Sequence, residues 1–461
     1  MSKKDPLKKI KSGVLSRGLA LAKVSVSAGA KAATHAVGNL FAEESSKPER
    51  LKALLIAQMD TLSQELGQLK GSMMKVGQLI SMYGEHFLPP EANALLKSLQ
   101  AQSPPLEWKA IERVIHKQIK PELLADLEID PVPVASASLG QVHRAFRKST
   151  GQWLAMKIQY PGVDQAIEGD LKALKSILQI SKLIPKGPNY DEVFNEIKAM
   201  LYQEVDYERE FKTTVEFRER LAQDSFYVIP EPIAEFSTRR ILTTTFEDGV
   251  ALDSAEVLGL SQERRDSIGA AALTLYMREL FEFAAVQTDP HFGNYRVRIG
   301  KEGEPDRLIL LDFGAVRKLS KSFLDAYLEM VRAAHAQDAG RIIEAGIRLG
   351  YLNEEDEKQV QQAFADLCLL ITEPFCPPPT PGAFARWFDL NGGYHWELSD
   401  LPERVAKKGA QLALGTRLRN PPREIVFLDR KLGGIFIFLS VLKVRFNARE
   451  LAKPFVQDAS G

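Results

Sequence analysis

Two short stretches in the second half of the chain carry residue types that suit phosphoryl transfer. Residues 287–294 hold Asp289 and Asn294, five positions apart on a predicted loop, and Asp312 opens an Asp-Phe-Gly eighteen residues after Asn294. Phosphoryl transfer needs a carboxylate that orients the attacking oxygen, and an amide and a second carboxylate that hold the metal ion bridging the phosphates. We therefore predict a nucleotide site. The plainer alternative is that Asp289 and Asn294 only cap a helix or close a turn.

Two elements must position these residues. A mostly apolar helix is predicted over residues 267–287 and would deliver the Asp289 loop from a buried position, and a short apolar strand over 308–311 would deliver Asp312. Helix is predicted to resume near Ser320. A peptide-directed kinase keeps a long activation segment and an Ala-Pro-Glu after its Asp-Phe-Gly. This chain has neither, so we expect no platform for a peptide substrate.

A lysine on a predicted strand is the next candidate. From Val134 the pattern changes to strands, with runs at 141–146 and 153–159 separated by a Ser-Thr-Gly turn. Lys157 is the one charged residue in the middle of the second run. A lysine that faces the buried side of a strand needs an anion. In a kinase-like site the expected partners are a phosphate and a helix carboxylate.

An acidic run offers that carboxylate. A long charged helix, or two helices, is predicted over residues 189–221. The run contains four carboxylates at alternate positions: Glu204, Asp206, Glu208 and Glu210. Residues four apart share a helix face, so one pair could meet Lys157 and the other Lys75. The plainer interpretation is a solvated acidic face.

The turn before the strands is built from small residues: Ala135, Ser136, Ala137 and Ser138. It stands where a kinase carries its glycine-rich loop, but only Gly140 is a glycine. Alanines restrict the backbone, so we expect a stiffer loop, in which the serine hydroxyls can donate to phosphate oxygens. Small residues are common in tight turns, and this segment alone decides little.

Residues 51–82 give a strong helix pattern, with apolar residues at spacings of four and three. A second stripe holds Gly67, Gly71, Lys75 and Gln78. Glycines cost a helix about 1 kcal/mol each, so two on one face suggest that another backbone comes close. Lys75 and Gln78 extend this face and could point into a site. The alternative is an exposed lysine and glutamine.

Composition limits the function classes. The 461 residues carry 60 basic and 60 acidic side chains, and this zero net charge argues against bulk nucleic-acid binding. Two cysteines, Cys368 and Cys376, are too few for a disulfide framework and fit a reducing compartment. No run of 18 uncharged apolar residues exists, so we predict no transmembrane helix. We also predict no secretory signal, because lysines interrupt the apolar segment near the start.

Residues 1–40 carry eight Lys/Arg residues and one acidic residue, Asp5. Three interpretations stay open. The segment could be a surface helix on anionic lipid, where each basic charge near the membrane contributes roughly 1 kcal/mol. It could also be a solvated tail, or a transit peptide, although it is richer in Lys than in Arg.

These motifs together resemble the UbiB-like (AarF-type) atypical kinases, a family tied to ubiquinone and other isoprenoid-lipid metabolism. The resemblance covers about residues 50–450. It rests on the following motifs: Lys75-Val76-Gly77-Gln78, residues 135–143 ending in Gly-Gln-Val-His, residues 155–163, Glu204-Val205-Asp206-Tyr207, Gln287-Thr288-Asp289-Pro290, Asn294, Asp312-Phe313-Gly314 and Arg430-Lys431-Leu432-Gly433-Gly434. Ser136 is a departure within the alanine-rich turn, and it affects the expected nucleotide preference.

The resemblance implies an α+β, two-lobed protein-kinase-like fold with a family-specific N-terminal helical extension. It divides the chain into four parts: a basic segment at 1–50, the helical extension at 51–130, the smaller lobe at 131–246 and a helical larger lobe at 247–461. The cofactors implied are ATP and Mg²⁺.

The resemblance also implies the residue roles. Lys157 contacts the nucleotide phosphates and pairs with Glu210, or second with Glu204. The turn from Ala135 to Ser138 covers the nucleotide, Asn294 and Asp312 bind Mg²⁺, and Asp289 is the catalytic carboxylate. Lys75, Gln78, Glu204 and Asp206 form a regulatory group over the active site, with Lys75 near Glu204 or Asp206, which would exclude a protein substrate.

We therefore expect an ATP- and Mg-dependent atypical kinase or ATPase that supports ubiquinone biosynthesis. Its expected partners are an isoprenoid or quinone lipid, an anionic membrane surface and other ubiquinone-biosynthesis proteins. We expect it in the cytoplasm or peripherally on the inner membrane. Two alternatives remain: a nucleotide-gated pseudokinase scaffold for lipid-biosynthetic enzymes, and a small-molecule phosphotransferase. The Lys75-to-Gln78 motif argues against the phosphotransferase.

Overall fold

The computed structural model describes residues 75–77, 79, 105–137, 139–180, 188–301, 303–376, 385–415 and 423–456. The chain divides into two compact units, each of which mixes helix and sheet. The first unit runs to Val215 and also contains Glu231–Phe246. The second contains Glu216–Pro230 and everything from Glu247 onward. Glu216–Pro230, which falls within the range 131–246 predicted for the smaller lobe, is thus grouped with the second unit.

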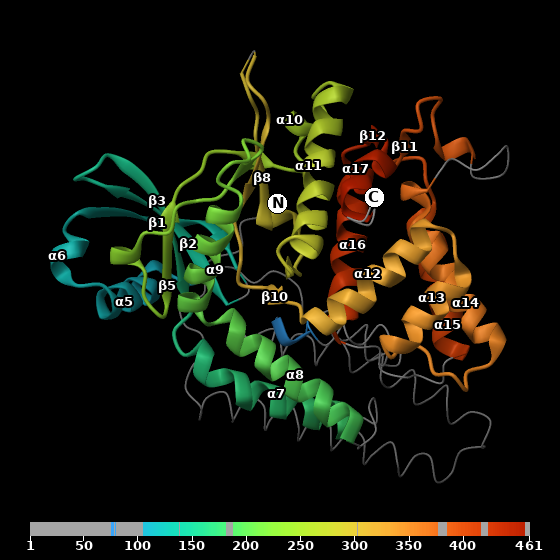
Figure 1. The fold of residues 1–461 in the computed structure, drawn as a ribbon. Coiled ribbons are helices and arrows are strands. Elements are labelled where there is room, and N and C mark those ends of the chain that lie inside the picture. Colours follow the sequence, from blue (N-terminus) through green and yellow to red (C-terminus); the bar gives the residue numbers. More distant parts are fainter. Residues whose placement is uncertain are drawn as a thin grey trace, which may run out of the picture. The chain divides into compact units, whose positions relative to one another are not determined.

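A four-stranded antiparallel sheet with the order β1-β2-β3-β5 organises the first unit (Figure 1). Its strands are β1 (Leu127–Ser136), β2 (Gly140–Arg147), β3 (Gln152–Gln159) and β5 (Ile241–Thr245). β3 lies between β2 and β5, and its alternate residues Leu154, Met156 and Ile158 are fully buried. Lys157 and Gln159 lie on the opposite face of the same strand, since side chains alternate along a strand.

The sheet begins earlier than the sequence predicted. β1 starts at Leu127, although strands were expected only from Val134, beyond two prolines. β1 is an edge strand, where a proline removes no ladder hydrogen bond from the sheet interior. The register with β2 shifts on either side of Pro133, so the strand absorbs the proline as a local irregularity.

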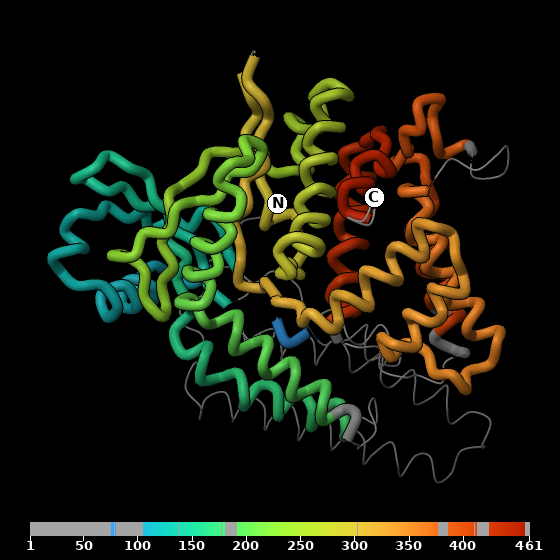
Figure 2. Tube along the Cα trace, viewed as in Figure 1, coloured from blue at the N-terminus to red at the C-terminus, as the bar shows by residue number. Residues whose placement is uncertain are grey.

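Helices complete the first unit: α5 (Trp108–Gln118), α6 (Pro121–Leu124), α7 (Val163–Ile180), α8 (Pro188–Glu204), most of α9 (Tyr207–Arg220) and the 3-10 turn η2 (Ala234–Phe236). The last turn of α9, from Glu216, belongs to the second unit. α7 and α8 pack side by side, as Figure 2 shows in green. Of the one helix or two helices predicted over 189–221, the structure has two. The carboxylate of Asp206 accepts the backbone N–H of Arg209 at 3.0 Å, which caps α9 and makes the break favourable.

Short strands in the second unit hold the predicted catalytic segments. One sheet has the order β4-β9-β8-β6 and β7 pairs with β10, while β11 pairs with β12. The strands are β4 (Tyr227–Val228), β6 (Val250–Ala251), β7 (Ala285–Gln287), β8 (Tyr295–Arg298), β9 (Arg307–Leu310), β10 (Val316–Lys318), β11 (Tyr394–His395) and β12 (Arg445–Phe446). The parallel pairing of β4 with β9 explains why the segment around Tyr227 belongs to this unit.

The rest of the second unit is mainly helical. Its helices are α10 (Ala255–Leu258), α11 (Gln262–Phe281), α12 (Lys321–His335), α13 (Ala339–Arg348), α14 (Lys358–Ile371), α15 (Leu401–Gly415), α16 (Arg423–Val441) and α17 (Ala448–Val456), with 3-10 turns η3 (Phe292–Asn294), η4 (Glu373–Phe375) and η5 (Ala385–Trp387). α11 and α16 lie against each other in the core (Figure 1). The hydroxyl of Ser320 caps α12, close to where helix was predicted to resume.

One helix ends earlier than predicted. The helix expected over 267–287 stops at Phe281, and residues 285–287 form β7 instead. Ala284 takes a left-handed backbone conformation, with φ of 48°, which breaks the helix. The next three residues then find ladder partners in β10, with Val316 opposite Gln287. An apolar run cannot by itself distinguish a buried helix from a buried strand.

Some predictions fall outside the described residues. These are the basic segment 1–40, the helix over 51–74, Gln78, Ser138 and most of the proline-rich loop at 374–382. Among the residues that the structure describes, none of the helices combines the length and apolarity that a membrane crossing requires.

Candidate active site

The predicted site residues fall into two groups, one in each unit. The first group centres on Lys157 of β3 and Glu210 of α9. The Lys157 Nζ atom donates to both carboxylate oxygens of Glu210, at 2.7 and 2.9 Å. The Glu210 side chain is 2% exposed and that of Lys157 is 20% exposed. The pair therefore leaves the lysine accessible to an anion while the carboxylate is enclosed, and Glu210 is the partner favoured from the sequence.

A glutamine that the sequence did not single out fixes the segment between the acidic residues. Gln159 lies two residues after Lys157 on the same face of β3, and its side-chain amide donates to the carbonyl of Val205 at 2.5 Å. Val205 separates α8 from α9. Gln159 thus places the end of α8 and the start of α9 against the strand that carries Lys157.

The predicted regulatory group is partly brought together. Lys75 pairs with Glu204 at 2.7 Å, and its side chain is only 7% exposed. Asp206, the other candidate partner, is exposed and caps α9. Gln78 lies outside the described residues. The two lysines therefore take different carboxylates, Lys75 at the end of α8 and Lys157 on α9.

The alanine-rich turn is tightly held. Ala135 and Ser136 end β1, and the Ala137 N–H donates to the Gly140 carbonyl at 2.9 Å. Tyr160 follows the end of β3 and is buried, and this burial raises the pKa of its hydroxyl. A Cβ added at Gly140 would overlap the carbonyl oxygen of Ile158, so this position requires glycine. The stiffness expected from the composition of this turn stays a prediction.

The Gln and His that follow this turn have structural partners. The Gln141 side chain accepts the Leu106 N–H at 2.9 Å and contacts a ring nitrogen of His143 at 2.8 Å. The other ring nitrogen lies 2.7 Å from the Asp130 carbonyl. Burial lowers the pKa of His143 below its usual value. Gln141 thus anchors β2 to the segment before α5, and His143 anchors it to β1.

The second group centres on Asp289 and Asn294, on the loop between β7 and β8. The Asn294 side-chain amide donates to the Asp289 carbonyl at 3.0 Å, which closes this loop. The Gln287 side chain accepts the Asp289 N–H at 2.9 Å and donates to the Asp312 carbonyl at 3.4 Å. Gln287 therefore links the Asp289 loop to the Asp-Phe-Gly segment. We name residues 288–294 the catalytic loop after the role predicted for Asp289 from the sequence.

Asp312 and Asn294 meet at one end of a strand pair. β8 and β9 are antiparallel with Tyr295 opposite Leu310, so Asn294 precedes β8 where the chain leaves β9. The Leu311 N–H donates to the Asn294 carbonyl at 3.0 Å, and the Asp312 carboxylate accepts the Gly314 N–H at 2.9 Å. An amide and a carboxylate fit Mg²⁺, which takes one or two protein oxygens and completes its shell with water and phosphate oxygens.

Arg430 and Lys431 of α16 reach the same region, although both were predicted only as members of a family motif. Arg430 donates to the Asp289 carboxylate at 2.8 Å. Lys431 is fully buried, donates to the Tyr295 hydroxyl at 2.8 Å and lies 3.5 Å from a Glu279 oxygen of α11. These residues are more than 130 positions from the catalytic loop, and no local spacing could have paired them.

Burial acts on both ends of the Lys431–Glu279 pair. It pulls the pKa of Lys431 down, but Glu279 and Tyr295 outweigh this, and the net shift is upward. Burial also raises the pKa of Glu279, which by itself would favour a neutral carboxyl. We assign the charged pair, because a neutral Glu279 would leave an ammonium enclosed without a counter-charge.

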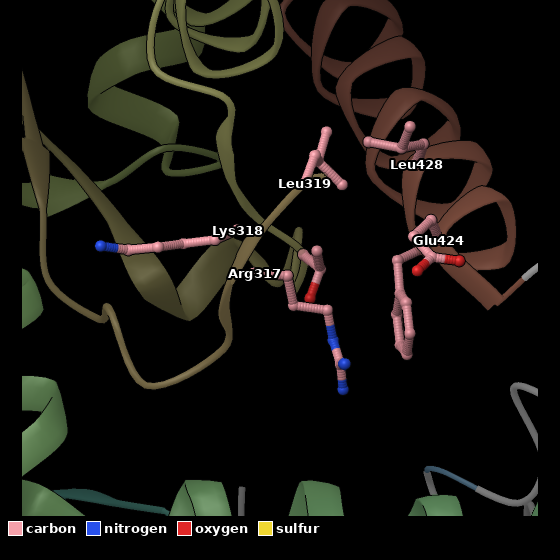
Figure 3. A pocket seen from close by; sticks show the side chains of 7 residues that line it. Arg317, Lys318, Leu319, Glu424 and Leu428 are labelled. Atoms are coloured by element: carbon pink, nitrogen blue, oxygen red, sulfur yellow. The ribbon is translucent and has the colours of Figure 1, made fainter. Parts of the chain in front are cut away.

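A small pocket of about 60 Å³ lies beside the catalytic loop (Figure 3). It is lined by Thr288, three consecutive residues around β10 and three residues of α16: Arg317, Lys318, Leu319, Glu424, Phe427 and Leu428. Leu319 and Leu428 face each other across it (Figure 3), and the Arg317 guanidinium stacks on Phe427 at 3.9 Å. This volume suits a few water molecules rather than a whole phosphoryl acceptor.

Comparison with known proteins gives consistent findings. Residues 98–346 match the family described as the ABC1 atypical kinase-like domain. The chain is 30% identical over 405 residues to "Probable serine/threonine-protein kinase abkA" of Dictyostelium discoideum, covering 84% of this chain and 69% of that protein. It is 32% identical over 396 residues to "Atypical kinase COQ8B, mitochondrial" of Danio rerio, covering 86% of this chain and 60% of that protein.

Two further matches extend the comparison. The chain is 28% identical over 454 residues to "Atypical kinase COQ8, mitochondrial" of Saccharomyces cerevisiae, covering 98% of this chain and 87% of that protein. A solved structure from Mycobacterium tuberculosis, the Rv3197–erythromycin complex, aligns with a TM-score of 0.57 at 23% identity and covers 89% of this chain and 98% of that one. This likeness and the family match confirm the predicted kinase-like α+β fold class.

Proposed function

Because the chain belongs to the ABC1 atypical kinase-like family, we propose that it is an ATP- and Mg-dependent kinase or ATPase that supports ubiquinone biosynthesis at a membrane. The observation that carries the nucleotide part is the Lys157–Glu210 pair. A strand lysine held by an enclosed helix carboxylate is the arrangement that kinases use to contact the phosphates of ATP.

In this proposal each group of residues has its own role. Lys157, fixed by Glu210, binds the phosphates, and the small-residue turn at 135–138 covers them. Asn294 and Asp312 hold Mg²⁺, which when bound supplies positive charge to the phosphate oxygens. Asp289 accepts a hydrogen bond from the attacking hydroxyl or water and orients it. Lys75, Gln78, Glu204 and Asp206 regulate access.

We also propose a link to ubiquinone biosynthesis and to an anionic membrane surface. The similar proteins from Danio rerio and Saccharomyces cerevisiae are named "Atypical kinase COQ8B, mitochondrial" and "Atypical kinase COQ8, mitochondrial". The family resemblance connects such kinases with ubiquinone and isoprenoid lipids. The basic residues of segment 1–40 suit an anionic membrane surface, beside which a quinone-precursor lipid and other biosynthetic proteins would be met.

A binding experiment tests the metal assignment. We expect Asp312→Asn to weaken binding of Mg-ATP about tenfold, because the neutral amide loses the charge attraction to Mg²⁺. Binding of ATP with the metal chelated should change much less. Isothermal calorimetry on the wild type and the variant, with and without Mg²⁺, measures both. Equal Mg-ATP affinities would show that Asp312 is not a metal ligand.

A turnover experiment separates the kinase from a scaffold. ATP hydrolysis is measured with Mg²⁺, with and without anionic liposomes that carry a quinone-precursor-like phenol. Stimulation by the lipid that is lost in Asp289→Asn supports a membrane-coupled kinase or ATPase. Mg-ATP binding without any turnover would instead favour the nucleotide-gated scaffold.

A further inference from the structure

One face of α16 contacts the catalytic loop at successive turns. Arg430, Gly434 and Phe438 are spaced by four residues, which places them on one side of the helix. Arg430 donates to the Asp289 carboxylate at 2.8 Å, and the Phe438 ring lies 4.3 Å from that of Phe292. These are polar and aromatic contacts to residues on either side of Pro290.

Gly434 marks the closest approach. A Cβ added there would overlap the ring of Pro290, which directly follows Asp289. The neighbouring Gly433 has open space around the same position. Glycine in a helix interior is unfavourable relative to alanine, so its presence at 434 is explained by the proline ring that lies against it.

Lys431 adds a contact behind the loop. It donates to the hydroxyl of Tyr295, the residue after Asn294, and lies 3.5 Å from Glu279 of α11. The ring of Phe438 also meets Tyr295, with centroids 5.1 Å apart. Both ends of the loop that carries Asp289 and Asn294 are therefore set by side chains of α16.

We propose that this face of α16 (Arg430, Lys431, Gly434 and Phe438) positions the catalytic loop, and that Arg430 is a positioning residue for Asp289. This inference rests on the proposed function, because it takes Asp289 as the catalytic carboxylate. The backbone of Asp289 is held by Gln287 and Asn294, whereas its carboxylate is held by Arg430. A guanidinium at this carboxylate also offsets the repulsion between Asp289 and the phosphates of a bound nucleotide.

The pair is suited to positioning more than to structural support. The Asp289 side chain is 16% exposed and that of Arg430 is 26% exposed, so both retain access to water. A partly hydrated ion pair contributes modestly to stability. Its geometric effect is larger, because a carboxylate displaced by about 1 Å from its productive position can lower turnover roughly 100-fold.

Amide hydrogen exchange of the ligand-free protein is the first test. We expect peptides from residues 287–295 to exchange roughly tenfold faster in Arg430→Gln and in Gly434→Ala. Gly433→Ala is the matched control for the glycine and should leave this loop unchanged. Arg348→Gln is the matched control for the arginine, since Arg348 pairs with Glu329 elsewhere in the same unit at 2.6 Å.

Kinetics are the second test. Arg430→Gln should lower kcat for ATP turnover roughly 10- to 100-fold while the Kd of Mg-ATP stays within about twofold. Arg430→Lys should recover part of kcat, because it keeps the charge but not the fork of donors. Unchanged exchange in both Arg430→Gln and Gly434→Ala, or unchanged kcat in an active enzyme, would overturn the inference. If the wild type shows no turnover, the kinase proposal fails and exchange alone decides the role of α16.

Discussion

The two units each hold a lysine–glutamate pair, and the pairs differ in enclosure. In the first unit Lys157 is 20% exposed above an enclosed Glu210, with a closest N–O distance of 2.7 Å. In the second unit Lys431 and Glu279 are 1% and 2% exposed, and their N–O distance is 3.5 Å. The first lysine remains accessible to a further anion. The second is sealed among protein groups and serves the packing of α16 against α11.

The two pairs differ in what the lysine can still contact. Both lysines are paired with a carboxylate from a helix that is distant in the sequence. An enclosed ion pair adds little net stability over an apolar pair, but it is costly to break from one side only. A partly open pair can release part of its charge to a ligand, which suits phosphate binding. Exposure of the lysine, rather than the presence of a partner, separates the two roles.

The largest expected effect is on folding. Lys431→Met leaves Glu279 enclosed without its cation and takes the donor from Tyr295, so we expect the free energy of unfolding to fall by about 3–5 kcal/mol. Urea denaturation followed by circular dichroism measures it. The double change Lys431→Met with Glu279→Gln should recover part of the loss. A single variant as stable as the wild type would remove the distinction between the pairs.

The next effect is on nucleotide affinity. Lys157→Arg keeps the charge beside Glu210 but changes the donor geometry, so we expect the Kd of Mg-ATP to rise about tenfold with unfolding free energy within about 1 kcal/mol of wild type. Calorimetry and denaturation measure the two. Lys198→Arg is the matched control, because Lys198 pairs with Glu168 at the same distance of 2.7 Å on the surface of the first unit. Wild-type affinity in Lys157→Arg would argue against phosphate contact.

The smallest expected effect is on the pH dependence of stability, through the buried side chain of His143. Burial lowers the pKa of His143, so the unfolded chain takes up a proton near pH 6.5 while the folded protein resists it. Stability is therefore fully present above pH 6.5 and declines as the pH falls toward the lowered pKa. We expect His143→Gln to flatten the decline between pH 7.5 and 5.5 by up to about 1 kcal/mol. Equal pH slopes in urea titrations of both proteins would contradict this.

The sequence determined the local features of the first unit. The alternation of Leu154, Met156 and Ile158 defines β3 and places Lys157 on its other face. A single lysine in an apolar strand needs an anionic partner, and the carboxylates of residues 204–210 were the candidates. Spacing alone could not decide which carboxylate pairs with Lys157. The break between α8 and α9 at Asp206 decides it, so that Glu204 pairs with Lys75 and Glu210 pairs with Lys157.

The motifs around Asp289 and Asp312 could also be predicted from short stretches of sequence. Asp289, Asn294 and Asp312 were predicted from their types and spacing, and the β8–β9 register places Asn294 and Asp312 at one strand end. The extent of the helix before them was wrong, because the pairing of β7 with β10 overrides an apolar helical pattern. Secondary structure in a short apolar run is set by its partner, which lies elsewhere in the chain.

Tertiary structure alone decided the role of α16. Its motif Arg430 to Gly434 could be quoted from the sequence, yet its contacts with Asp289, Pro290 and Tyr295 cross more than 130 positions of chain. Periodicity reports which face of a helix is apolar, but not which loop that face meets. Residue types and short spacings thus indicated the chemistry proposed for this protein. Only long-range packing decided which side chains hold the Asp289 carboxylate, because pairing between distant segments follows the fold and not local spacing.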